Sequence, residues 1–299
     1  MRIMKIATHN EDIDGIVSAA LFLIKYPDAE IRFLSVQQAR ETEEFFDCVV
    51  DLPKTKNCSV NIDHHETNYK LLRREGLLSE RDIIDPSAPS TASLVIKVLG
   101  LEDDNTAKQL VNMANLADTG RLDERLRLLD YVIKLNIGNE KVLRKIAEIL
   151  AKRGSKFDED PWLKRELKKV SKLVQEVSER LMTQIDQLVK SGVKYAVLDC
   201  RNVPFFIVKE AARWFLNRGG KAVAVIYIDP NSGKDRVSIR LGSETSLSAS
   251  ELAEKIGGGG HLKAAGAVLE KGGLERAVGI LIQEFSREGF TVIFRKITI

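Results

Sequence analysis

The chain has 299 residues, of which 44% are hydrophobic and 30% charged, so it can bury a substantial core in two domains of ordinary size. Its net charge of +3 is too small to indicate nucleic-acid binding by itself. Apolar runs of roughly 18 residues and a secretory signal are both absent from the sequence, so we expect a cytoplasmic protein with no membrane partner. The three cysteines show neither zinc-site spacing nor the even number of a disulfide framework.

The first part of the chain alternates strand-like and helical patterns. Residues 3–8 form an apolar run, a polar loop follows, and the apolar spacing over 16–24 predicts a helix. Three more strand-like runs cover 31–36, 48–50 and 59–62, and the last two lead into acidic residues. Strands that alternate with helices predict a parallel sheet whose ligand site lies at the carboxyl ends of the strands.

Helical patterns continue from residue 90 to about 149. Ser90 or Thr91 is placed to cap the first of these helices, and Gly100 to end it. After a polar break, residues 161–189 read as one long charged helix. We interpret this helix as a connector between domains.

A second alternating region follows the connector. Strands are expected at 195–198, 222–228 and 236–241, with a helix over 208–216. The segment GGGGH at 257–261 comes next, and the Ala-rich residues after it could begin another helix.

These patterns predict an α/β fold in three parts. An N-terminal parallel-sheet domain would occupy residues 1–120, and a helical middle region with the connector would occupy 121–190. A smaller C-terminal α/β domain would occupy 191–299.

The loop after the first strand carries His9, Asp12 and Asp14. Imidazole and carboxylate groups together suit borderline divalent ions such as Mn²⁺, and closely spaced acids are costly unless a cation neutralises them. The alternative is a polar loop in which Asp14 caps the following helix.

Two further strand ends carry similar groups. Asp51 follows the run ending at Val50, where a turn or cap residue is the alternative. Asp63, His64 and His65 follow the next run, and one histidine could bind a metal while its neighbour faces a phosphate. A structural pair of histidines is the other interpretation.

The remaining motifs lie further along the chain. Asp118 precedes Thr119 and Gly120, a pattern that alone would mark the end of a helix. The glycines of 257–260 expose backbone N–H groups that can bind phosphate oxygens, although a flexible linker has the same composition. All four histidines of the chain lie in these motifs, and this clustering favours the functional interpretation over the separate structural ones.

Together the motifs resemble the DHH phosphoesterase family, which is named for the triplet seen here as Asp63-His64-His65 and carries a C-terminal DHH-associated domain. The resemblance covers nearly the whole chain. Its four N-terminal motifs appear in order, and its GGGHxxAAG pattern appears at residues 258–266. It is closest in kind to the single-strand exonucleases of the archaeal type and to the oligoribonucleases of that family.

The resemblance implies a site for two Mn²⁺ ions, with Mg²⁺ or Co²⁺ as alternatives. The first ion would be held by His9, Asp12 and Asp51. The second would be held by Asp14, Asp51, His64 and Asp118. Asp51 would then bridge two ions about 4 Å apart, and a bridging water or hydroxide would attack phosphorus in line with the leaving oxygen.

The resemblance also implies roles for residues that do not bind metal. Asp63 would orient a neighbouring histidine, and His65 would contact the phosphate. Substrate groups of the second domain would be Arg240, Gly258, Gly259, Gly260 and His261. The substrate would lie in a cleft between the metal site and these groups.

We expect an exonuclease that acts on single-stranded DNA or RNA ends, with 3′–5′ polarity favoured. The alternatives are an oligoribonuclease or 3′-phosphoadenosine phosphate phosphatase, and a cyclic dinucleotide phosphodiesterase. A non-catalytic protein of a replication or repair assembly is a further alternative, although such proteins usually lose metal ligands. A repair or replication protein could also be a partner of the active enzyme.

The helical region from about 121 to 189 supports a nucleic-acid partner through its basic side chains, although a solvated helix face balanced by Glu would look the same. These side chains are Lys152, Arg153, Lys164, Arg165, Lys168 and Lys169. An apolar series at helical spacing could instead pair two subunits, so we expect a homo-oligomer. This series is Leu163, Leu167, Val170, Leu173 and Val177.

Overall fold

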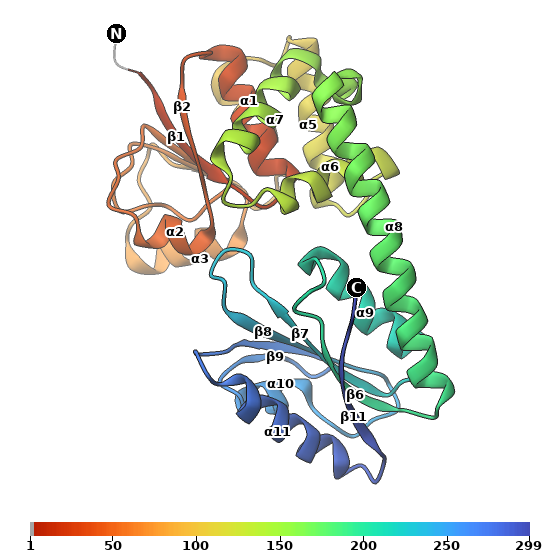
Figure 1. The fold of residues 1–299 in the computed structure, drawn as a ribbon. Helices are drawn as coiled ribbons and strands as arrows, with labels where there is room; N and C mark the ends of the chain where they lie inside the picture. Colours follow the sequence, from red (N-terminus) through yellow and green to blue (C-terminus); the bar gives the residue numbers. More distant parts are fainter. Residues whose placement is uncertain (1–2) are drawn as a thin grey trace. The chain divides into compact units, whose positions relative to one another are not determined.

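A five-stranded, all-parallel sheet forms the centre of the N-terminal part of the chain (Figure 1). The computed structural model describes residues 3–299 and divides into two units, one ending at Ser171 and one running from Lys172 to Ile299. The strand order is β2-β1-β3-β4-β5. The strands are β1 (Lys5–His9), β2 (Glu30–Leu34), β3 (Cys48–Val50), β4 (Asn61–Asp63) and β5 (Ile83–Ile84).

Helix α1 (Ile13–Lys25) is buried along most of its length, from Ile13 to Leu23. Asp12 caps its N-terminus by accepting a hydrogen bond from the Gly15 backbone N–H at 3.0 Å. A Cβ on Gly15 would lie 2.3 Å from the carbonyl oxygen of His9. Glycine therefore lets the first turn of α1 approach the end of β1, which brings the acidic loop to the strand end.

The other helices of this unit surround α1 and the sheet. The expected helix after Ser90 is α4 (Ala92–Leu99), and Gly100 ends it in the left-handed conformation, as predicted. The remaining helices are α2 (Val36–Glu41), α3 (Glu66–Glu75), α5 (Asn105–Asp118), α6 (Glu124–Leu135), α7 (Glu140–Arg153) and the 3₁₀ turn Gly154–Glu159.

Helix α8 (Pro161–Lys190) is the long charged helix expected at 161–189. Of the apolar series along it, Leu163, Leu167, Val170 and Val177 are buried within the chain and Leu173 is partly exposed. The chain itself therefore covers most of the series through which we expected two subunits to pair, and the homo-oligomer stays a prediction.

The C-terminal unit contains a mixed six-stranded sheet in the order β11-β6-β7-β8-β10-β9. Its elements are β6 (Tyr195–Asp199), α9 (Phe205–Asn217), β7 (Ala222–Ile228), β8 (Asp235–Leu241), α10 (Ala249–Glu254), β9 (Gly259–His261), β10 (Ala264–Val268), α11 (Leu274–Ser286) and β11 (Val292–Lys296). Residues such as Tyr195 and Ala224 pack with Leu281 and Phe285 of α11 on one face, and α9 contacts β7.

The Ala-rich segment after the glycines is a strand, and the expected helix was wrong. Residues 264–268 pair antiparallel with β8 on one side, and 264–266 pair with β9 on the other. A Cβ on Gly266 would lie 2.6 Å from the Val237 carbonyl oxygen, so glycine permits this close pairing. Strand pairing thus overrides the helix propensity of alanine.

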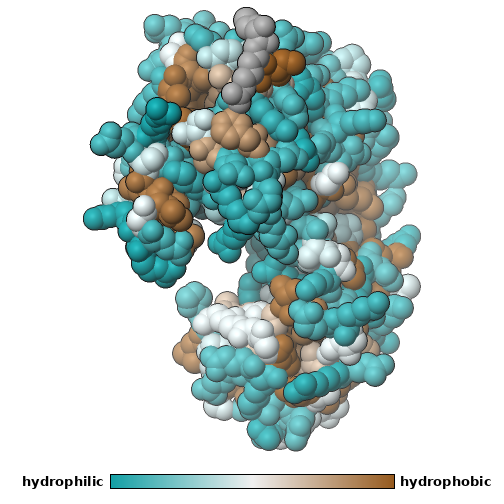
Figure 2. Space-filling model, turned by 90° about the vertical axis from the view of Figure 1, so that its left-hand side faces the viewer, coloured by the Kyte–Doolittle hydropathy of each residue, from teal (hydrophilic) through white to brown (hydrophobic). Residues whose placement is uncertain are grey.

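The overall α/β class was predicted correctly, with a parallel N-terminal sheet, a helical middle and a C-terminal α/β unit. On the face shown in Figure 2 most side chains are hydrophilic and the apolar ones form small groups. Within the described residues, none of the helices combines the length and apolar character needed to span a bilayer.

Candidate metal centre

The carboxyl ends of three neighbouring parallel strands carry the predicted ligands. His9 ends β1, Asp51 directly follows β3, and Asp63 ends β4. Because β1 pairs with β3 and β3 with β4, the chain segments that leave them meet at one edge of the sheet. Asp118 reaches the same place as the last residue of α5.

His9, Asp12 and Asp51 form the first group of ligand atoms, all within 4.8 Å of one another. His9 Nδ1 lies 2.7 Å from Asp12 Oδ2 and 3.8 Å from Asp51 Oδ2. This is the group that the resemblance assigns to the first metal ion.

Asp14, His64 and Asp118 form a second such group. His64 Nε2 lies 3.3 Å from Asp118 Oδ2 and 3.9 Å from Asp14 Oδ2. The other ring nitrogen, Nδ1, lies 3.2 Å from the Ala88 carbonyl oxygen, which can only accept a hydrogen bond. The proton therefore belongs on Nδ1, and the Nε2 lone pair faces the acids as a metal ligand requires.

Asp51 lies between the two groups. Its Oδ2 faces His9, and its Oδ1 lies 4.0 Å from His64 Nε2 and 3.8 Å from His65 Nδ1. Its φ of 55° is the only positive value among the described residues other than glycine. Such a backbone is strained and persists only where surrounding structure enforces it.

The chemistry of these groups fits a pair of divalent cations. Asp51 is 3% exposed, and its buried Oδ2 has no hydrogen-bond partner among the described residues. A buried carboxylate oxygen without a partner is costly, and a cation would satisfy it. Oxygen and imidazole nitrogen are the ligands that Mn²⁺ and similar ions accept.

The pKa values report the same crowding of charge. Burial, together with the charges of Asp14 and Asp12, raises the pKa of Asp51 well above its usual value and that of Asp118 to about 8. Burial tends to lower the pKa of His9, but the Asp12 carboxylate, together with the charges of Glu11 and Asp14, outweighs burial and raises this pKa to about 9. Bound cations would replace these protons and remove the repulsion between the acids.

Asp63 supports the histidines and belongs to none of the groups of possible metal ligands. Its Oδ1 accepts from the His65 ring Nδ1 at 2.7 Å and from the backbone N–H groups of His64 and His65 at 2.8 and 3.2 Å. Asn68 donates to its other oxygen at 2.7 Å. The Nε2 atom of the exposed His65 remains available for a ligand.

Two predicted capping interactions are rearranged around the centre. Asp14 caps no turn of its own helix and accepts from the backbone N–H groups of Thr91 and Ala92 at 2.7 and 2.9 Å, at the start of α4. The Thr91 side chain makes no capping hydrogen bond. Its hydroxyl donates to Asp51 Oδ1 at 2.9 Å. Of the two residues expected to cap α4, it is therefore Ser90 whose hydroxyl accepts a hydrogen bond from a backbone N–H of the first turn, that of Ser93 at 3.3 Å.

The C-terminal unit holds the predicted substrate groups on adjoining strands. Ala264 of β10 pairs with Arg240 of β8 on one side and with His261 of β9 on the other. Residues on one rung point to the same face of a sheet, so Arg240 and His261 share a face. Their side chains are half-buried and exposed, respectively.

The predicted glycines have different steric needs. A Cβ added at Gly258 would lie 2.1 Å from the Gly266 carbonyl oxygen, and one added at Gly260 would lie 2.5 Å from the Ala265 Cα. No atom would lie within 4 Å of a Cβ at Gly259. Gly258 and Gly260 are therefore required by the hairpin itself, whereas Gly259 leaves an open approach to the backbone.

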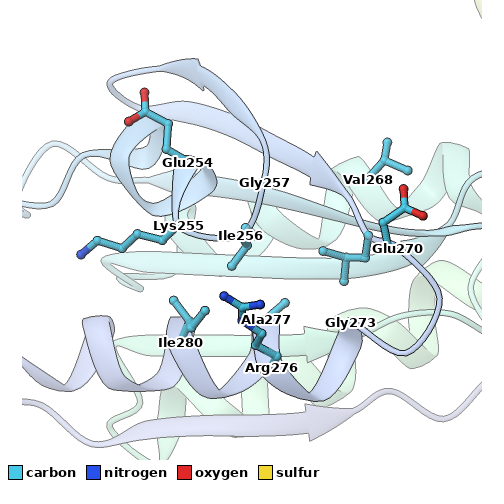
Figure 3. Close-up of a pocket in the computed structure, with 11 residues that line it drawn as sticks. Glu254, Lys255, Ile256, Gly257, Val268, Glu270, Gly273, Arg276, Ala277 and Ile280 are labelled. Atoms are coloured by element: carbon cyan, nitrogen blue, oxygen red, sulfur yellow. The ribbon is translucent and has the colours of Figure 1, made fainter.

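A pocket of about 460 Å³ lies elsewhere in this unit, between the turn after α10, the end of β10 and α11 (Figure 3). The Arg276 side chain is directed toward Ile256 and Gly257 across it. The lining includes none of Arg240, Gly258, Gly259, Gly260 and His261, so this pocket is distinct from the predicted substrate groups.

Known proteins match the C-terminal part of the chain in sequence and the whole chain in fold. The DHHA1 domain family matches residues 192–287. Over the whole chain the fold is similar to the pGpG-specific phosphodiesterase PggH from Vibrio cholerae, with 17% identity, a TM-score of 0.61, and coverage of 96% of this chain and 100% of that one.

Two RecJ structures are also similar in fold. Exonuclease RecJ bound to manganese shares 13% identity at a TM-score of 0.52, with 95% of this chain and 90% of that chain covered. RecJ from Thermus thermophilus in complex with Mn²⁺ shares 14% identity at a TM-score of 0.52, with 98% of this chain but 53% of that chain covered. No curated protein sequence matches the chain. Residues 192–287 therefore match the DHHA1 domain family, and the fold over the whole chain is similar to those of PggH and RecJ.

Proposed function

We propose that the protein is a divalent-metal-dependent phosphodiesterase that removes nucleotides from the end of single-stranded nucleic acid or of a short oligonucleotide. The observation that carries this proposal is the position of Asp51, whose two carboxylate oxygens face two separate groups of ligand atoms. One carboxylate between two cation sites is the arrangement that two-metal phosphoryl chemistry needs.

The residues of the N-terminal unit divide into those that would bind a cation and those that orient other side chains. His9, Asp12 and Asp51 would hold one cation, and Asp14, His64 and Asp118 the other, with Asp51 shared. Two bound Mn²⁺ ions, or Mg²⁺ or Co²⁺ in their place, would supply a water of lowered pKa and neutralise charge on the phosphate. No protein nucleophile is needed.

The Asp63 carboxylate fixes the His65 ring by accepting a hydrogen bond from Nδ1, which leaves Nε2 to contact a phosphate oxygen. From the C-terminal unit we propose Arg240, His261 and the backbone of Gly258, Gly259 and Gly260 as substrate groups. Their shared face and the open space at Gly259 support this role.

Single-stranded DNA or RNA, digested 3′–5′, is our preferred substrate. Its support is the set of exposed cationic side chains on α7 and α8, which could follow a phosphate backbone. Some of them are already paired, as Lys169 is with Glu166 at 2.7 Å.

A linear dinucleotide is the second candidate. Its support is that PggH, described as pGpG-specific, matches over 96% of this chain and over its own full length. A cytoplasmic location, a homo-oligomeric state and a repair or replication partner remain predictions from the sequence.

The test is a substrate panel with purified protein and Mn²⁺. Single strands of DNA and RNA labelled at either end are compared with pGpG, 3′-phosphoadenosine phosphate and a cyclic dinucleotide. Stepwise shortening of the strands, absent in Asp51→Ala, would support the preferred activity. Faster turnover of pGpG than of a decanucleotide would favour the second candidate, and no product from any substrate would refute both.

A further inference from the structure

Thr91 contacts acidic ligands from both groups of the metal centre. Its hydroxyl donates to Asp51 Oδ1 at 2.9 Å, and its backbone N–H donates to Asp14 Oδ2 at 2.7 Å. The next backbone N–H, of Ala92, donates to Asp14 Oδ1 at 2.9 Å. Thr91 is fully buried, so water does not compete for these hydrogen bonds.

The hydroxyl of Thr91 is the single hydrogen-bond donor to the Asp51 side chain among the described residues. Rotation about the last bond of an aspartate side chain is soft, so the plane of a carboxylate depends on its partners. With Oδ1 fixed by Thr91, Oδ2 is directed toward His9. The hydrogen bond therefore sets how Asp51 divides its two oxygens between the two groups.

A role as an ordinary helix cap does not account for this hydroxyl. Thr91 lies at the N-cap position of α4 but makes no side-chain capping bond. The neighbouring Ser90 hydroxyl accepts instead from the Ser93 backbone N–H at 3.3 Å. The start of α4 is thus satisfied by Ser90 and Asp14, and the Thr91 hydroxyl is left for Asp51.

We infer that Thr91 is a positioning residue of the metal centre, whose hydroxyl orients the Asp51 carboxylate shared by the two cation sites while its backbone N–H fixes Asp14. The inference rests on the proposed metal dependence. It makes the start of α4 part of the support that sets the geometry of both sites relative to each other.

Two substitutions separate the hydroxyl from the rest of the side chain. Thr91→Val keeps the shape and the backbone N–H to Asp14 but removes the donor to Asp51. Thr91→Ser keeps the donor and removes a methyl group. Partners of metal ligands typically change metal affinity by about 10–100-fold when lost, so we expect that reduction in Thr91→Val and near-wild-type affinity in Thr91→Ser.

The measurement is calorimetric titration of the metal-free full-length proteins with Mn²⁺, together with melting curves in EDTA. Melting curves that show a cooperative transition for both variants establish that each is folded. If Thr91→Val does not fold, Thr91→Ala removes the same donor and takes its place in the titration.

Equal Mn²⁺ affinity of Thr91→Val and wild type would overturn the inference. A loss of Mn²⁺ affinity in Thr91→Ser as large as that in Thr91→Val would also overturn it, because the effect would then belong to the methyl group. Absence of Mn²⁺ binding by wild type would also overturn it. Wild-type protein that binds Mn²⁺ without cleaving any phosphodiester would refute the proposed function alone, because the affinities still decide the role of Thr91.

Discussion

Replacing Asp51 by Asn should have opposite effects on stability with and without metal. Asp51→Asn keeps the size of the side chain but removes its charge. In the metal-free protein the Asp51 carboxylate is buried, its Oδ2 has no hydrogen-bond partner, and the charges of Asp14 and Asp12 repel it. A buried polar atom without a partner costs about 1–3 kcal/mol, and a charged one costs more. Asn leaves a polar amide in the same place, so the substitution relieves the part of this cost that is due to the charge.

We therefore expect Asp51→Asn to stabilise the metal-free protein at pH 8 by about 1–3 kcal/mol. For a unit of this size 1 kcal/mol corresponds to roughly 2–4 °C, so the melting temperature should rise by about 2–12 °C. Burial raises the pKa of Asp51, so the folded protein keeps this proton to higher pH than the unfolded chain. The wild type then loses stability as pH rises above the ordinary aspartate pKa of about 4. Near pH 4 and below, the stability gain from Asp51→Asn should vanish.

With Mn²⁺ present, wild type should melt at a higher temperature than Asp51→Asn. A ligand at 100 times its Kd stabilises a folded protein by about 2.7 kcal/mol, or roughly 5–11 °C here. Wild type should show at least this rise, whereas Asp51→Asn lacks the shared ligand and should show little. Melting curves in EDTA and in Mn²⁺, at pH 4 and 8, test both parts. The exposed Asp103→Asn is the control and should match wild type.

A metal-free Asp51→Asn protein that melts below wild type at pH 8 would refute the account of a strained, unsatisfied carboxylate. A variant that gains as much from Mn²⁺ as wild type would show that Asp51 holds no cation.

Four further substitutions test other parts of the site. Asn68→Asp replaces the amide that donates to Asp63 at 2.7 Å by a second carboxyl, so kcat should fall by about 10–100-fold; an unchanged kcat with Asn68→Asp would exclude a positioning role. Gly260→Ala would place a Cβ 2.5 Å from backbone and should lower stability by at least about 1 kcal/mol. Gly259→Ala meets open space and should stay within about 0.5 kcal/mol by urea unfolding, and equal losses would contradict the hairpin geometry. His261→Ala should raise KM with Mn²⁺ affinity unchanged, as measured by steady-state kinetics and calorimetry, and loss of Mn²⁺ binding would oppose the assignment to substrate.

Much of the fold could be predicted because its strands are buried apolar runs. The runs at 48–50 and 222–228 coincide with β3 and β7. β5 was missed, because two isoleucines in a polar segment give no periodic signal. Val36 was assigned to a strand but begins α2, since the Ser35 and Gln38 capping box starts a helix there.

The side chains that gather in the candidate metal centre could be predicted because each lies in a short local motif at the end of a strand or helix. The groups that hydrogen-bond to these side chains could not be predicted. Thr91 meets Asp51 across 40 positions of sequence, and Ala88 meets His64 across 24. Nothing local in the sequence marks either partner, because each contact is created by the packing of α4 beside the sheet.

The ligands around Asp51 come from segments spread between residue 9 and residue 118. A cation bound to them would act as a cross-link that closes several long chain loops at once. The N-terminal unit could then open only after the ion leaves, so resistance to proteolysis would depend on the rate of metal dissociation. Chelation should therefore expose this unit to protease, whereas excess Mn²⁺ should protect it.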